Sequence, residues 1–178
     1  NRNVYTSGTM RSPNQEGTAR VLIVDDEPVI QDVLRGVLSA EGYDVGSAAD
    51  AATARTMLES ERDWDVVLLD VCLPGLSGFE VTRRLNQASP DVGIIILTVH
   101  EQAPYPAQLL EAGASAYLTK GCPADEMFEA IQTVAAGRPF VSSEVSRKLT
   151  LARLTGRDPD SPFNVLSQRE MQVLMMIT

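Results

Sequence analysis

The sequence predicts a doubly wound α/β domain built on a parallel sheet, and three observations support this prediction. Four short runs are apolar on both faces, as expected for buried parallel strands. Stretches with helical periodicity separate these runs, so that strands and helices alternate along the chain. Each apolar run also stops at a polar residue. In sheets of this kind, binding sites form beyond the carboxyl ends of the strands.

Five strands and five helices are expected between residues 20 and 138. The strands are the four apolar runs and one weaker segment typical of a sheet edge, at residues 21–24, 43–47, 66–69, 94–97 and 116–119. The helices are expected at residues 29–40, 51–60, 78–86, 106–112 and 124–136. Gly137 and Pro139 end the last helix, because Gly favours helix ends and Pro cannot continue a helix. Residues 20–138 form the first predicted domain.

The rest of the chain is expected to form three further segments. Residues 1–19 have no periodicity and are expected to be a disordered extension or a tag. Residues 139–163 are predicted to be a linker that contains a helix. In residues 164–178, Ser167 and Glu170 fit a helix-capping box and predict the start of another helix.

The composition is that of a soluble intracellular protein, and the charge is unevenly distributed. Hydrophobic residues make up 44% of the 178 residues, and no apolar stretch approaches the roughly 20 residues that span a bilayer. The two cysteines, Cys72 and Cys122, are too few for a disulfide framework. Residues 139–178 contain five basic and four acidic residues, which leaves ten basic and twenty acidic residues in residues 1–138. Such an acidic domain repels nucleic acid and favours a metal cation or a basic partner.

Three aspartates stand at the predicted ends of two strands. Asp25 and Asp26 follow the first apolar run, and Asp70 follows the run at residues 66–69. Carboxylates that converge at one edge of a sheet repel one another unless a cation neutralises them, and such hard oxygen ligands suit Mg²⁺. A turn or a helix cap would explain one of these aspartates. The full set of three favours a metal site.

Two further polar residues end the remaining apolar runs. Thr98 offers a hydroxyl group, and Lys120 is the only lysine before residue 139. A lysine is a compact cation that can pair with a carboxylate or a phosphoryl oxygen. Together with the three aspartates, these residues predict a phosphoryl-transfer site arranged around one nucleophilic carboxylate.

The combined motifs resemble the receiver domain of bacterial two-component response regulators. The similarity rests on Val-Asp-Asp at 24–26, Leu-Pro-Gly-Leu-Ser-Gly at 73–78 after Asp70, Leu-Thr at 97–98, Ala-Gly-Ala at 112–114 and Tyr-Leu-Thr-Lys at 117–120. It covers about residues 20–138 and implies a flavodoxin/CheY-like sheet of five strands in the order 2-1-3-4-5.

The resemblance also implies a role for each site residue. Asp70 would accept a phosphoryl group from a sensor histidine kinase, and Lys120 would contact that group. Asp26, Asp70 and the backbone carbonyl of Cys72 would bind Mg²⁺, with Asp25 acting through water. The implied protein is a cytoplasmic phosphoprotein with no membrane contact.

The resemblance extends to a switch and to an output domain. Thr98 and Tyr117 would form the switch pair, with Tyr117 turning inward after phosphorylation. Leu-Ser-x-Arg-Glu at 166–170 resembles the first helix of a LuxR/NarL-type helix-turn-helix domain, and residues 97–163 are similar to GacA/UvrY-type regulators. The output domain is expected to be truncated here, so that DNA is bound only by the full-length parent. Phosphorylation is expected to promote a homodimer.

Two alternative functions use the same residues. A Mg²⁺-dependent phosphohydrolase with an Asp nucleophile would need a second aspartate two residues further on, where Cys72 stands, and a long insertion for a substrate cap. A docking-only pseudo-receiver would lack part of the site. The sequence therefore favours a signalling protein that catalyses only its own phosphorylation and dephosphorylation.

Overall fold

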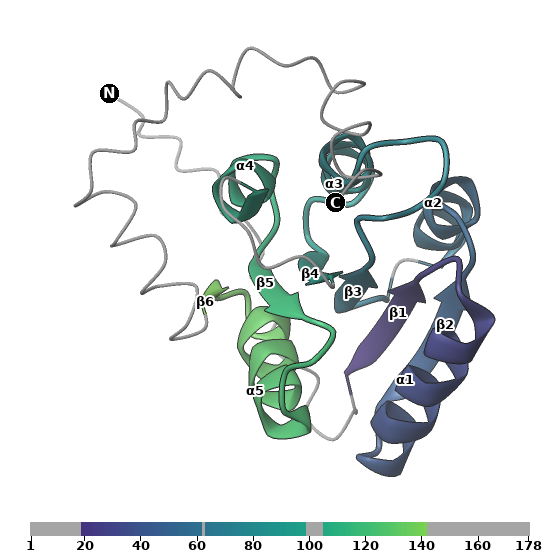
Figure 1. The fold of residues 1–178 in the computed structure, drawn as a ribbon, viewed down its shortest axis with the longest axis vertical. Coiled ribbons are helices and arrows are strands. Elements are labelled where there is room, and N and C mark those ends of the chain that lie inside the picture. The colour runs from purple at the N-terminus through teal and green to yellow at the C-terminus, as the bar shows by residue number, and fades with distance from the viewer. Residues whose placement is uncertain (1–18, 62, 99–104, 142–178) are drawn as a thin grey trace, which may run out of the picture.

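The computed structural model describes residues 19–61, 63–98 and 105–141, which form a three-layer α/β domain (Figure 1). The strands are β1 (Arg20–Val24), β2 (Asp44–Ala48), β3 (Val66–Leu69), β4 (Gly93–Thr98), β5 (Ala116–Thr119) and β6 (Phe140–Val141). The helices are α1 (Pro28–Ala40), α2 (Ala51–Ser60), α3 (Gly78–Ala88), α4 (Tyr105–Glu111) and α5 (Ala124–Ala135). All five predicted strands and all five predicted helices are present, with ends that differ by at most two residues.

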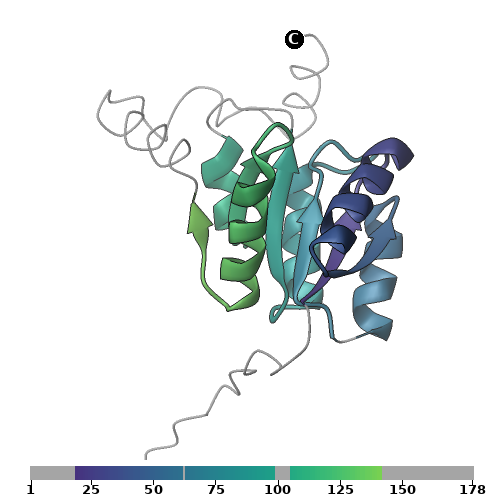
Figure 2. The same ribbon diagram turned by 90° about the horizontal axis from the view of Figure 1, so that it is seen from below.

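The strands form one parallel sheet in the order β2-β1-β3-β4-β5-β6. The doubly wound fold and the order 2-1-3-4-5 are thus confirmed. Because every strand runs in the same direction, all carboxyl ends lie along one edge of the sheet (Figure 2). We call this the carboxyl edge, and the opposite one the amino edge.

A sixth strand corrects the prediction of five. β6 pairs with β5, placing Phe140 opposite Ala116 and Val141 opposite Tyr117, and the Phe140 N–H donates to the Ser115 carbonyl at 2.9 Å. The physical reason is that the outer edge of β5 would otherwise expose unpaired backbone groups. The first residues of the predicted linker therefore belong to the sheet.

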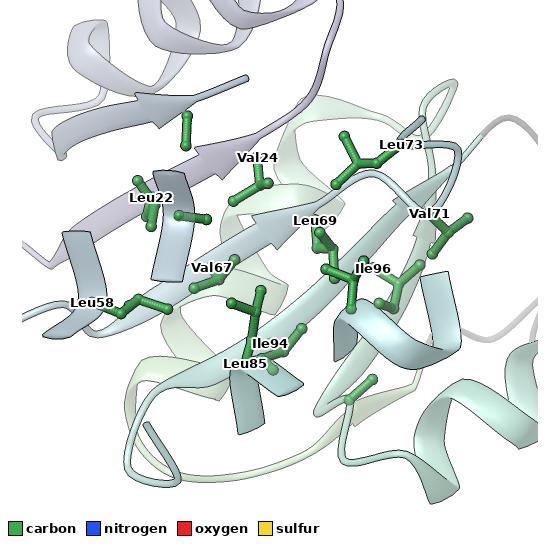
Figure 3. Close-up of a cluster of buried hydrophobic side chains, with 14 of the residues drawn as sticks. Leu22, Val24, Leu58, Val67, Leu69, Val71, Leu73, Leu85, Ile94 and Ile96 are labelled. Carbon is green, nitrogen blue, oxygen red and sulfur yellow. The ribbon is translucent and has the colours of Figure 1, made fainter. Parts of the chain in front are cut away.

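Alternating strand residues fill two cores, one on each face of the sheet. Leu22, Val67 and Ile94 face the layer of α2, α3 and α4 (Figure 3). Their sequence neighbours face the layer of α1 and α5, where Leu38 and Ile131 pack against them. This burial on both faces explains why the strands read as continuous apolar runs.

The loop after β3 is fixed by a close contact at the start of α3. A Cβ on Gly78 would lie 2.4 Å from the Cβ of Val71, so that only glycine fits against this part of the loop. Ser77 caps α3, its side chain accepting a hydrogen bond from the Glu80 N–H at 3.3 Å. The Leu-Ser-Gly part of the motif therefore holds the loop that follows Asp70.

Arg20 organises a cluster of charges at the amino edge. Its guanidinium pairs with Asp44 at 2.6 Å, with Glu61 at 3.0 Å, and with Asp63. The same group lies over the ring of Trp64, 4.3 Å from its centroid. We call these residues the Arg20 cluster, which connects the starts of β1 and β2 to the loop before β3.

Several predicted segments lie outside the described residues. They include the extension at residues 1–18, the predicted linker helix and the capped helix expected at residues 164–178. Within the part of the chain that is described, no helix has both the length and the apolar character needed to cross a membrane.

Candidate functional site

Three aspartates meet at the carboxyl edge, as the sequence predicts. Asp25 and Asp26 follow β1, and Asp70 follows β3, which pairs with β1 so that Val24 lies opposite Leu69. Carboxylate oxygens of the three aspartates lie within 4.8 Å of one another. Asp25 and Asp70 are buried, with exposures of 1% and 4%, whereas Asp26 is exposed.

Backbone hydrogen bonds fix the two buried aspartates. The Asp70 N–H donates to the Val24 carbonyl at 2.9 Å, and the Asp25 N–H donates to the Ala48 carbonyl at 3.2 Å. Each bond extends the pairing of neighbouring strands one residue beyond a strand end. The carboxylates therefore project from a rigid part of the backbone.

Lys120 reaches the same edge from the end of β5 and bridges the two buried carboxylates. Its Nζ lies 2.8 Å from Oδ2 of Asp25 and 2.8 Å from Oδ2 of Asp70. The backbone N–H of Lys120 donates a hydrogen bond to the Thr98 carbonyl at 2.7 Å. Burial opposes the charge of the ammonium group, but hydrogen bonds to both aspartates outweigh it and raise the pKa of Lys120 above its usual value. Lys120 is thus a firmly held cation.

Asp70 is oriented through both of its carboxylate oxygens. Oδ1 accepts a hydrogen bond from the Cys72 N–H at 3.0 Å, and Oδ2 accepts one from Lys120. The residue follows β3, which lies between β1 and β4 near the middle of the sheet. A carboxylate held in this way can act as a nucleophile toward a phosphoryl group.

The three aspartates suit a divalent metal ion. Carboxylates offer the hard oxygen ligands that Mg²⁺ prefers, and exposed Asp26 leaves one side of the group open to water. Among the described residues, no other group of three or more His, Cys, Asp or Glu side chains is close enough to hold an ion. The residues therefore fit a Mg²⁺ site, and the role of the Cys72 carbonyl stays a prediction.

Thr98 and Tyr117 lie on neighbouring strands. Thr98 ends β4 and is fully buried, and Tyr117 lies in β5 opposite Ile96. Tyr117 is only 2% exposed and packs in the same core as Leu109 of α4. The resemblance implied that phosphorylation turns this ring inward, but the ring is buried in the structure described here.

The side chain of Cys72 lies beside the site without being activated. Burial of the thiol and the nearby charge of Asp70 raise the pKa of Cys72, while Lys120 and Thr98 only partly oppose this effect. A thiol with a raised pKa is a weak nucleophile near neutral pH. The position where a phosphohydrolase would carry its second aspartate therefore holds a thiol in place of a carboxylate.

Two residues of the site were missed by the sequence analysis. Glu27 contributes a carboxylate oxygen 3.8 Å from Nζ of Lys120, and its N–H donates to Oδ1 of Asp25 at 2.9 Å. Gln31 of α1 donates from Nε2 to the Asp25 carbonyl at 2.5 Å. A polar residue between the apolar positions of Ile30 and Leu34 was the available signal for Gln31.

Comparison with known proteins agrees with this geometry. The family described as "Response regulator receiver domain" matches residues 21–132. The chain is 39% identical over 159 residues to the response regulator GacA of Pseudomonas aeruginosa, covering 89% of this chain and 74% of that relative. The similarity to GacA/UvrY-type regulators is thereby confirmed.

Solved structures give the same result. A LuxR-family two-component response regulator from Aurantimonas sp. SI85-9A1 has a TM-score of 0.72 and 34% identity, over 78% of this chain and 99% of that one. A response regulator from Burkholderia pseudomallei, with a phosphorylated aspartic acid, a calcium ion and citrate, has a TM-score of 0.62 and 27% identity, over 75% of this chain and 74% of that one. Motifs, geometry and a family match to more than half of the chain agree, and the protein belongs to the response regulator receiver family.

Proposed function

We propose that Asp70 is the phosphoacceptor of a two-component system and receives its phosphoryl group from a sensor histidine kinase. One observation carries this assignment. Asp70 is buried beside two other aspartates, and both of its carboxylate oxygens are held, one by the Cys72 N–H and one by Lys120. The Burkholderia pseudomallei relative, whose structure includes a phosphorylated aspartic acid, supports the same chemistry.

The transfer exchanges one bond to phosphorus for another. A carboxylate oxygen of Asp70 attacks the phosphorus of a phosphohistidine, and a P–O bond forms as the P–N bond breaks. The electron pair of the broken bond returns to the imidazole ring. Lys120, 2.8 Å from Oδ2 of Asp70, is placed to stabilise the negative charge of the transferred group. The hydroxyl of Thr98 is proposed to contact a phosphoryl oxygen.

Asp26, Asp70 and the carbonyl of Cys72 are the proposed ligands of Mg²⁺, with Asp25 acting through water. A bound cation would supply positive charge that offsets the repulsion between the carboxylates and the incoming phosphoryl group. The close approach of the three aspartates supports this proposal. The calcium ion in the Burkholderia pseudomallei structure supports it as well.

Thr98 and Tyr117 are the proposed switch pair. Because Tyr117 is buried in the structure, phosphorylation would stabilise this inward position rather than create it, as a shift between existing populations. Val141 of β6 lies opposite Tyr117, so the last described strand pairs beside the proposed switch. We propose that this switch controls a DNA-binding output in the cytoplasm, and that homodimers form after phosphorylation.

Labelling with acetyl phosphate and Mg²⁺, followed by intact-mass measurement, tests the assignment. We expect one phosphoryl group on the parent and none on Asp70→Asn. Asp63→Asn is the matched control, because Asp63 is exposed at the amino edge and should not affect labelling. Labelling of Asp70→Asn equal to that of the parent would disprove the assignment.

The same experiment separates the alternative functions. Continuous release of inorganic phosphate without accumulation of the labelled protein would indicate a phosphohydrolase. A parent chain that is never labelled would indicate a docking-only pseudo-receiver. Stable labelling at Asp70 supports the receiver function.

A further inference from the structure

The loop between β1 and α1 holds the side chains of Asp25 and Asp26 in different ways. Oδ1 of Asp25 accepts a hydrogen bond from the Glu27 N–H at 2.9 Å, and Oδ2 lies 2.8 Å from Nζ of Lys120. Within the described part of the chain, no hydrogen bond or ion pair holds the exposed side chain of Asp26. The direction of the Asp26 carboxylate therefore depends on the backbone that carries it.

Gln31 of α1 holds this backbone on both sides of Asp26. Its side-chain Nε2 donates to the Asp25 carbonyl at 2.5 Å, and its backbone N–H donates to the Glu27 carbonyl at 3.1 Å. The Asp25 carbonyl belongs to the peptide unit that joins Asp25 to Asp26. Because a peptide unit is planar, a bond that fixes its oxygen also fixes the point from which Asp26 starts. Gln31 therefore influences the one aspartate of the three whose side chain is not otherwise held.

The same amide connects α1 to the end of β2. Nε2 of Gln31 donates to the Ala48 carbonyl at 3.3 Å, and this carbonyl also accepts the bond from the Asp25 N–H at 3.2 Å. One amide nitrogen carries two N–H donors, so it can serve the carbonyls of both Asp25 and Ala48. The Asp25 N–H already pairs the two strand ends without the glutamine. What Gln31 adds is its bond to the peptide unit before Asp26.

The chemistry of Gln31 suits a role beside a cation. Its side chain is partly buried and reaches the carboxyl edge from the first turn of α1. An amide donates hydrogen bonds without carrying a charge, so Gln31 adds no positive charge that would compete with a metal ion. Groups that orient a metal ligand usually change the metal affinity by about 10- to 100-fold when they are removed. The hydrogen bonds of Gln31 place it in such a position relative to Asp26.

We propose that Gln31 is a positioning residue for Mg²⁺ binding, and that it acts by fixing the peptide unit between Asp25 and Asp26. This inference rests on the proposed function, because it concerns the same Mg²⁺ site. Gln31 is not itself a ligand. It limits the directions that the Asp26 carboxylate can take, so that less conformational freedom is lost when the ion binds. Without the amide, the chain still folds but binds Mg²⁺ more weakly.

Calorimetric titration of the full chain with MgCl₂ at neutral pH tests this role. Gln31→Leu removes the amide while keeping a side chain of similar size, and Gln31→Ala removes it without adding apolar bulk. Both variants should raise the Kd for Mg²⁺ by about tenfold. Gln87→Leu is the matched control, because Gln87 is exposed near the end of α3 and far along the helix from the carboxyl edge. This control should bind Mg²⁺ with the Kd of the parent.

Two further measurements separate positioning from folding. Thermal unfolding in EDTA reports the stability of the chain without metal. A glutamine that only stabilises the fold would lower this midpoint and leave the Kd for Mg²⁺ unchanged at temperatures where the chain is folded. The rate of labelling by acetyl phosphate is also measured at increasing Mg²⁺ concentrations. For Gln31→Leu, the concentration that gives half of the maximal rate should rise about tenfold, while the maximal rate stays within about twofold of the parent value.

Several results would overturn the role of Gln31. A parent Kd in both Gln31 variants would contradict it, as would a lower maximal rate with an unchanged requirement for Mg²⁺. An equal rise in Kd for Gln87→Leu would show that the effect is not specific to the loop. A parent chain that binds no Mg²⁺ would refute the proposed metal site together with this inference. A parent chain that binds Mg²⁺ but is never labelled would refute only the phosphoacceptor assignment, and the Kd values would still decide the role of Gln31.

Discussion

Two clusters at opposite edges of the sheet each combine one basic side chain with several carboxylates, in different surroundings. The carboxyl edge has three aspartates and Lys120, and the Arg20 cluster at the amino edge has three carboxylates and one arginine. The side chains of Lys120 and Asp70 are 13% and 4% exposed. The side chains of the carboxylates paired with Arg20 are 48% to 63% exposed.

This difference in burial gives the two clusters different roles. Water screens the exposed ion pairs of the Arg20 cluster. These pairs connect the segments at the amino edge but change the free energy of unfolding little. At the carboxyl edge, one partly buried lysine faces more negative charge than it can neutralise. The burial of Asp25 and Asp70 makes that imbalance costly. The buried cluster therefore favours an added cation, whereas the exposed cluster does not need one. The number of charges alone would not distinguish a site from a surface ion pair.

Replacing Lys120 should have the largest effect on stability. Lys120→Met would leave the buried carboxylates of Asp25 and Asp70 without their cation. We expect the free energy of unfolding without metal to fall by about 3 kcal/mol, measured by urea denaturation in EDTA. Addition of Mg²⁺ should recover part of the loss. An unchanged urea midpoint in EDTA would show that the buried pairs are not required.

The matched substitution at the amino edge should have a smaller effect. Arg20→Met keeps an apolar side chain at this position but removes the guanidinium, with its ion pairs and its contact with the Trp64 ring. We expect a loss of about 1 kcal/mol in the free energy of unfolding, which shrinks when NaCl is raised because exposed ion pairs are screened. A loss as large as that of Lys120→Met, and insensitive to salt, would remove the distinction between the two clusters.

The smallest effect is expected for a single exposed carboxylate. Asp63 is 61% exposed and shares Arg20 with two other acids. The free energy of unfolding of Asp63→Asn should stay within about 0.5 kcal/mol of the parent value. Chemical denaturation at neutral pH measures this difference. A larger loss would mean that the Arg20 cluster depends on each of its members.

The sequence predicted the carboxyl edge well because strand ends determine it. Asp25, Asp26 and Asp70 come directly after apolar runs, and parallel pairing must bring such positions together. Lys120 and Thr98 follow the same rule. The order of residues along the chain was therefore enough to predict which side chains lie together in the site. It did not show that Lys120 bridges two carboxylates at once.

Features that depend on how elements pack could not be predicted in the same way. β6 forms because α5 returns the chain to the open edge of β5. The two residues of β6, Phe140 and Val141, are too few to show a strand pattern in the sequence. The buried position of Tyr117 depends on the packing of α4. Apolar residues cover much of the circumference of α1, so only the packed structure shows that Val33 faces solvent while Leu38 faces the core.

Binding of Mg²⁺ tests most directly whether the buried cluster is the cation site. Thermal unfolding is measured near neutral pH with and without Mg²⁺ for the parent, Asp26→Ala and Asp63→Ala. A ligand at 100 times its Kd stabilises the folded state by about 2.7 kcal/mol, which is easily seen as a shift in Tm. We expect Mg²⁺ to raise the Tm of the parent and of Asp63→Ala but not that of Asp26→Ala, which should still fold. A shift that persists in Asp26→Ala, or disappears in Asp63→Ala, would contradict this account.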